Sequence, residues 1–167
     1  SGTSRWNPEL LSAPSDKMDI PEGVDWDLWI GTRKPRPYHS AYCPVSWRDF
    51  WDFGTGALGD IGCHDMDAAV WGLDLKHPLT IEGRPGGRTN DQIVPHAEIV
   101  YYQFGKREGW PEIRLTWYDG GLKPPIPSIM PSGFNLEGRG NMFVGEKGVV
   151  ICGGAGAPPK LYPESLN

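Results

Sequence analysis

The fold of this chain is decided by the stretch Gly54-Thr-Gly-Ala-Leu-Gly-Asp60-Ile-Gly-Cys-His64-Asp-Met-Asp67-Ala-Ala-Val-Trp71, in which a glycine-rich turn runs into a helical pattern. At about 100° per residue, one narrow stripe of the predicted helix carries Asp60, His64, Asp67 and Trp71. The opposite side is small or apolar: Leu58, Gly62, Met66, Ala69, Val70 and Leu73. The pattern predicts a helix that packs through one face and presents polar groups on the other.

The polar stripe is also the strongest candidate for chemistry. A histidine with a carboxylate one helical turn away can accept and release a proton, so we predict Asp60 and His64 as a catalytic pair. Two alternatives stay open, namely a polar face that simply meets water and a metal site formed by Asp60, His64 and Asp67. One helix rarely supplies three ligands at good geometry, so the expectation is no metal.

Composition sets limits on the class of protein. The chain has 167 residues, enough for one domain, and carries 16 Lys and Arg against 21 Asp and Glu, a net charge of −5. Because there is no basic cluster and no long apolar run, we expect neither a nucleic-acid nor a membrane partner. No signal peptide is visible, and the compartment, cytoplasmic or periplasmic, stays open. Three cysteines without metal-ligand spacing argue against a disulfide framework.

Patterns on either side of the helix predict an α+β domain. Residues 1–24 are polar and rich in proline, which is typical of an extended N-terminal arm, and the domain itself is expected at 25–167. Within it we predict a short helical turn at 25–31, followed after the helix by strands at 79–83, 96–104, 112–118, 141–145 and 148–152. The expected fold is an open, mainly antiparallel β-sheet with one or two helices packed on one face and long Pro/Gly-rich loops.

The turn before the helix matches the dinucleotide fingerprint G-x-G-x-x-G literally, at Gly54, Gly56 and Gly59. Its surroundings argue against a dinucleotide site. The preceding segment is charged rather than a buried strand, and no βαβ unit follows. We also expect Asp60 in the first helical turn, where a pyrophosphate would have to lie. The prediction is therefore that this chain contains no cofactor-binding residues.

A proline-punctuated loop at 32–44 offers side chains for substrate binding. Sugar-like ligands need guanidinium and hydroxyl partners with aromatic faces nearby, which Arg36, Tyr38 and His39 can provide. Asp67, on the helix stripe, is a further candidate for substrate binding. A purely structural role for these loop residues remains an open alternative.

Several segments together resemble the C-terminal half of Gfo/Idh/MocA-type oxidoreductases, relatives of glucose–fructose oxidoreductase and inositol dehydrogenase. The resemblance spans nearly the whole chain, from about Trp6 to Leu166, and is most specific at Asp60 and His64. It is greatest to the branch abundant in Bacteroidetes and planctomycete-like bacteria. The segments that carry it are 26–31, 36–38, 47–67, 117–121 and 143–148.

The resemblance implies a division of labour between two domains. In that family an N-terminal Rossmann domain binds NAD or NADP, whereas the C-terminal domain supplies the substrate pocket and often the oligomer interface. Asp60 and His64 match the family's D-x-x-x-H acid/base pair, and 54–56 corresponds to its glycine triplet. The catalytic lysine belongs to a Glu-Lys-Pro motif of the Rossmann half, which this sequence lacks. The chain is therefore expected to be incomplete relative to the family and inactive alone.

The predicted function is the substrate-binding and acid/base domain of an NAD(P)-dependent sugar or polyol oxidoreductase. The alternative is a non-catalytic carbohydrate-binding or oligomerisation module. Expected partners are the sugar or polyol, the missing Rossmann domain, and further copies of the chain. The expectation of further copies rests on the aromatic surface of the predicted strands, which is larger than one helical layer can cover. An uncovered apolar sheet face tends to pair with a second copy. The aromatic residues are Tyr101, Tyr102, Trp117 and Tyr118.

Overall fold

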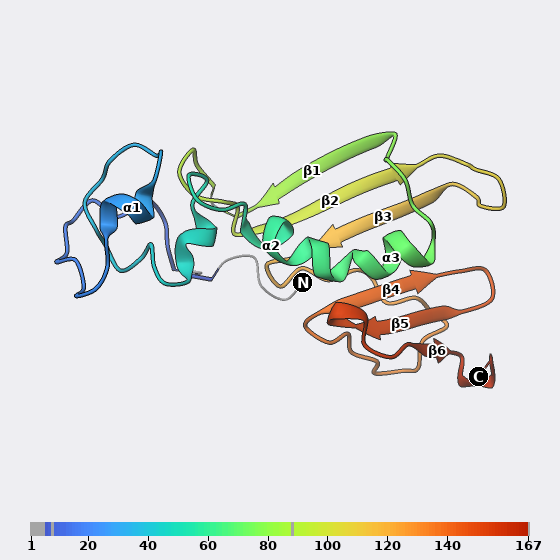
Figure 1. Ribbon diagram of the computed structural model, residues 1–167. Helices are drawn as coiled ribbons and strands as arrows, with labels where there is room; N and C mark the ends of the chain where they lie inside the picture. The colour runs from blue at the N-terminus through green and yellow to red at the C-terminus, as the bar shows by residue number, and fades with distance from the viewer. Residues whose placement is uncertain (1–5, 8, 88, 167) are drawn as a thin grey trace.

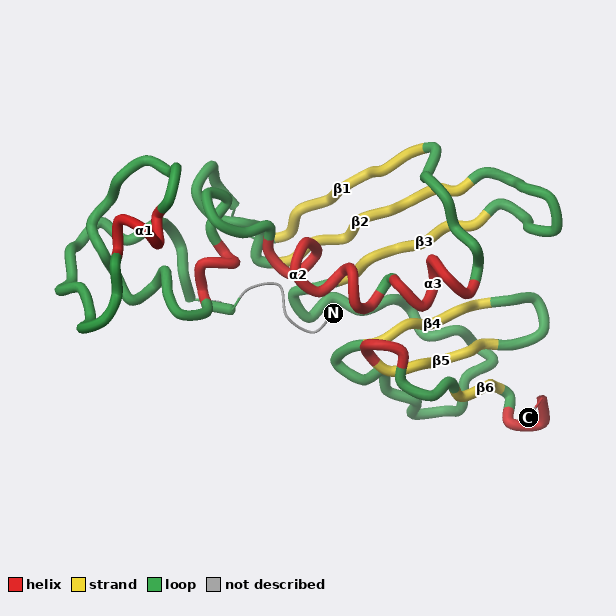
Figure 2. Tube along the Cα trace, in the orientation of Figure 1, coloured by secondary structure: helices red, strands yellow, loops and turns green. Residues whose placement is uncertain are grey.

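A computed structural model describes residues 6, 7, 9–87 and 89–166. Its helical part comprises α1 (Trp26–Ile30), the 3₁₀ helix η1 (Ser46–Asp49), α2 (Gly56–Asp65) and α3 (Asp67–Gly72). Two three-stranded antiparallel sheets follow (Figures 1 and 2): β1 (Thr80–Gly86), β2 (Ala97–Phe104) and β3 (Ile113–Tyr118), then β4 (Gly140–Val144), β5 (Val149–Gly153) and β6 (Lys160–Tyr162). Short 3₁₀ helices η2 (Gly154–Gly156) and η3 (Glu164–Leu166) complete the order. The predicted α+β class with open antiparallel strands is confirmed, although the strands form two sheets rather than the single sheet that was predicted.

The first sheet and the helices α2 and α3 enclose the main core. In the pairing of β2 with β3, Val100 lies opposite Trp117 and Tyr102 opposite Leu115, so these four side chains share one face. That face packs against the small and apolar side of the helices, where Ala57 and Ala69 are buried. Val70 departs from the predicted apolar face because it is 41% exposed.

The helices also contact the second sheet, and Figure 1 shows them running between the two sheets. A buried carboxylate makes the connection. The two oxygens of Asp65 accept hydrogen bonds from Arg139 Nε at 2.8 and 3.0 Å, and Oδ1 accepts one from the Ala155 amide at 3.3 Å. Phe143 of β4 adds an apolar contact to the core around α3. The helical layer is thus held from both sides.

The part of the chain before α2 has an aromatic core of its own. Helix α1 begins at Asp25, whose Oδ1 accepts a hydrogen bond from the Leu28 amide at 3.0 Å, and it ends at Gly31 with φ of 63°. Around it lie the buried residues Trp26, Ile30, Tyr38, Tyr42, Phe50 and Ile93. The described residues before α1 contain neither helix nor strand. The domain boundary near residue 24 stays a prediction.

Within the described ranges, each helix falls short of the length and apolar character that spanning a membrane requires.

Candidate functional site

The three glycines at the start of α2, Gly54 just before it and Gly56 and Gly59 within it, each have a structural role. A Cβ at Gly54 would lie 2.5 Å from the backbone of Arg48. Gly56 has a φ of +64°, in the left-handed region that favours glycine, and Gly59 lies over the Thr55 side chain, which a Cβ would overlap. The segment before the turn is the 3₁₀ helix η1 rather than a parallel strand. Packing within the chain therefore accounts for the fingerprint-like spacing, and the surroundings do not fit a dinucleotide.

Arg48 occupies the centre of the site. Its Nε donates a hydrogen bond to Oδ2 of Asp60 at 3.1 Å, and Nη1 donates to the Val45 carbonyl oxygen at 3.1 Å. The guanidinium carbon lies 4.5 Å from the ring centroid of Trp47 and 5.3 Å from that of Trp6. Two cation–π contacts and two hydrogen bonds restrict the guanidinium to one orientation.

The neighbouring Asp49 fixes the N-terminal segment beside this arginine. Its side chain is fully buried, and its two oxygens accept hydrogen bonds from the amides of Trp6 at 3.0 Å and Asn7 at 2.7 Å. Backbone amides stabilise a carboxylate that has left water, because they replace the hydrogen bonds of its hydration shell. Asp49 therefore places the Trp6 ring against Arg48.

A depression of about 300 Å³ opens in front of the start of α2. It combines the side chains of two arginines, three aromatic residues and one carboxylate, contributed by the loop after α1, by η1, by the turn between η1 and α2, and by α2. The lining residues are Arg33, Trp47, Arg48, Trp51, Phe53, Gly54, Thr55, Gly59 and Asp60. Aromatic faces beside charged hydrogen-bonding groups suit a small polyhydroxylated ligand.

The rest of the predicted stripe continues from this depression along the helices. His64 and Asp67 are exposed, and Trp71 is 83% exposed. Among the described residues no hydrogen bond or ion pair joins Asp60 to His64, and no group of three His, Cys, Asp or Glu side chains is placed to hold a metal ion. Helix α2 begins at Gly56, so Asp60 lies in its second turn; the prediction of a first-turn position was wrong.

The loop residues predicted to bind substrate are not among the residues that line the depression. Arg36 forms an ion pair with Asp52. Partial burial opposes the charge of this guanidinium, but the bond to Asp52 raises its pKa, so it stays protonated. Tyr38 is buried in the aromatic core, and His39 Nδ1 accepts a hydrogen bond from the Ala41 amide at 3.0 Å. Substrate contact by these three residues stays a prediction.

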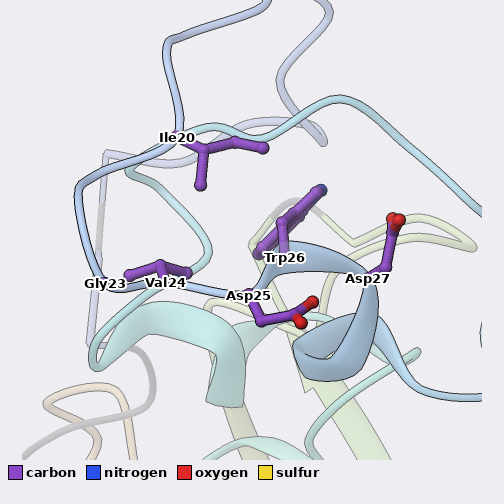
Figure 3. A pocket seen from close by; sticks show the side chains of 6 residues that line it. All are labelled: Ile20, Gly23, Val24, Asp25, Trp26 and Asp27. Atoms are coloured by element: carbon purple, nitrogen blue, oxygen red, sulfur yellow. The ribbon is translucent and has the colours of Figure 1, made fainter.

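A second depression, of about 520 Å³, lies at the start of α1. Figure 3 shows Ile20 and Val24 on one side and Trp26 and Asp27 on the other. It is shallow and open, and the Asp25 side chain in its wall serves as the helix cap. Because its charged lining side chains are two carboxylates without an arginine, it is the poorer candidate for a sugar site.

Sequence reasoning missed the residues that line the depression next to Asp60. Arg33, Trp47, Arg48 and Trp51 lie in segments that the sequence marked only as a loop and as the approach to the turn. One signal was available, because Trp47-Arg48 and Trp51 precede the glycine turn directly. Their convergence with Arg33 needed the tertiary structure.

Residues 11–107 match the family model described as "Oxidoreductase family, C-terminal alpha/beta domain". The match covers more than half of the chain and includes η1, α2, α3 and the whole lining of the depression. A search of curated proteins found no match.

Proposed function

Because the chain belongs to the Gfo/Idh/MocA oxidoreductase family, as its C-terminal domain, we propose that it binds the substrate and moves the proton in an NAD(P)-dependent oxidation of a sugar or polyol. The observation that carries this proposal is the depression at the start of α2, where aromatic rings, arginines and Asp60 meet. His64 follows one helical turn, about 5.4 Å, further along. The residues 25–167 form the substrate domain in this proposal.

His64 is the proton acceptor of the proposed reaction. Oxidation of an alcohol to a ketone removes the hydroxyl proton and a hydride from the carbon, and an exposed imidazole near neutral pH can take the proton. Asp60 uses Oδ2 for Arg48, whereas Oδ1 has no partner in the described structure. That oxygen is available to the His64 ring or to a substrate hydroxyl. Asp60 thus positions the ring or the substrate and is itself oriented by Arg48.

The substrate rests in the depression against Trp47 and Trp51. Asp67, exposed one further turn along the helices, binds hydroxyl groups at the far end of the site. Arg36, Tyr38 and His39 are further proposed substrate contacts. The guanidinium carbon of Arg36 lies 5.1 Å from the ring centroid of Phe53, which lines the depression. Within the family, we propose the branch abundant in Bacteroidetes and planctomycete-like bacteria, which the sequence resembles.

The cofactor of the parent protein is NAD or NADP in this proposal, held by a Rossmann domain. The described residues do not fit a dinucleotide, because the fingerprint glycines pack within the chain and the sheets are antiparallel. This domain therefore handles the proton and the substrate, and it is inactive without its partner domain.

A non-catalytic module for carbohydrate binding or oligomerisation is the second candidate. It is favoured by the outer face of the first sheet. There the guanidinium carbons of Arg84 and Arg114 lie 5.8 and 4.5 Å from the ring centroid of Tyr101. Tyr118 shares that face, whereas Trp117 and Tyr102 are turned toward the helices. We propose that two copies of the chain associate through this face, whichever function holds.

The experiment measures kcat in the protein that carries both domains. His64→Ala is expected to lower kcat by about 10²–10⁴-fold, the range of a general acid–base group. Because His64 is exposed, Tm should not change. Asp60→Asn should lower kcat less and should also lower Tm, since it weakens the contact with Arg48. His77→Ala, an exposed histidine between α3 and β1, is the control. An unchanged kcat for His64→Ala would refute the assignment.

A further inference from the structure

The charges around the depression at the start of α2 do not balance. Asp60 is the carboxylate among its lining residues, and it is paired with Arg48 through the 3.1 Å contact. Arg33 contributes a second guanidinium, for which the described structure shows no acidic partner. The lining therefore carries an excess of one positive charge, in a chain whose net charge is −5.

The start of α2 adds to this positive field. Thr55 is the N-cap residue, but its side chain makes no capping hydrogen bond. The first amides of a helix point outward and carry the positive end of its dipole, which favours an anion in front of them. Thr55 lines the depression together with the two arginines. The Arg33 guanidinium and the start of α2 thus both contribute positive potential to one small space.

Arg48 has one terminal nitrogen that remains available to contact a ligand. Nε and Nη1 are used by Asp60 and by the Val45 carbonyl, whereas Nη2 has no partner among the described residues. The rings of Trp6 and Trp47 restrict the guanidinium, so little side-chain entropy is lost when a ligand binds. Arg33 is exposed and can approach the ligand from the loop side.

We propose that the sugar bound in this depression carries an anionic group, a carboxylate or a phosphate, which Arg33 contacts directly and Arg48 contacts through Nη2. This proposal rests on the proposed function, because it deepens the substrate class of the same site. A volume of about 300 Å³ is at the lower limit of small-molecule sites and suits one sugar ring. The ring lies against Trp47 and Trp51, and the anionic group faces the arginines.

Calorimetric titration of the chain with glucuronate, glucose 6-phosphate and glucose tests this proposal. We expect at least one of the two anions to bind about tenfold more tightly than glucose, and the stronger anion identifies the group as carboxylate or phosphate. Arg33→Gln should remove that preference, because it weakens the binding of the preferred anion by about tenfold. Lys34→Gln is the matched control, because it removes the same charge from the adjacent, exposed residue, which does not line the depression.

Any of three results would overturn the proposal. These are glucose binding as tightly as both anions, equal effects of the Arg33 and Lys34 substitutions, and the absence of saturable heat with both anions. Thermal melting of each variant shows that it is folded. The outcome is separable from that of the proposed function, because anion preference is a binding measurement on this chain whereas the role of His64 is measured by kcat.

Discussion

A rise in pH through neutrality is expected to destabilise the fold through one pair of carboxyl groups. Glu98 in β2 lies next to Asp119, which directly follows β3 and is buried. Asp119 accepts hydrogen bonds from the Glu98 amide at 2.7 Å and from Trp117 Nε1 at 2.9 Å. Burial, and then the negative charge of Asp119, raise the pKa of Glu98 from 4.5 to about 7.

The sign and the size of the effect follow from this shift. The folded state binds the Glu98 proton more strongly than the unfolded chain does, so the contribution is complete below about pH 4.5 and is lost as the pH rises through about 7. Because Glu98 is only half-buried, solvent screening reduces the contribution that the difference between 4.5 and about 7 would give, and we expect about 1–2 kcal/mol. The free energy of unfolding should fall by up to this amount by about pH 8.

Urea unfolding followed by tryptophan fluorescence, at several pH values from about 5 to about 8, measures this contribution in wild type and in Glu98→Gln. Glutamine stays neutral and can donate a hydrogen bond to Asp119, as protonated Glu98 does. The two proteins should be equally stable near pH 5, and the variant should become more stable as the pH rises. Glu112→Gln, an exposed glutamate before β3, is the control. Parallel curves for wild type and Glu98→Gln would refute the reasoning.

Two further predictions concern the N-terminal segment and assembly. Asp49→Ala should lower the free energy of unfolding by about 2–4 kcal/mol, because the amides of Trp6 and Asn7 lose their buried acceptor. Chemical denaturation measures this loss. Asp91→Ala, a change at an exposed aspartate, is the control and should have almost no effect. Light scattering should show a dimer or larger particle, and Tyr101→Asp should convert it to a monomer. A strictly monomeric wild type at high concentration would argue against an interface through the outer face of the first sheet.

Much of the fold was predictable because its signals are local. The strict alternation of Ile113, Leu115 and Trp117 with polar neighbours requires only a strand with one covered face, and β3 has it. The helix after the glycine turn likewise shows its packing face in its own periodicity. The division of the strands into two sheets carries no such local signal, since it depends on which hydrogen-bonding edges meet in space.

The candidate site was likewise predictable from the sequence only in part. The sequence by itself determined the helical stripe of Asp60, His64 and Asp67, because a period of 3.6 residues places them on one face. Only the tertiary structure decided that Asp60 pairs with Arg48, and that Asp65 is buried against Arg139, 74 residues away. A carboxylate gives no sign in its own segment of the partner that compensates its burial. That partner is chosen by packing between distant segments, and packing exists only once the chain has folded.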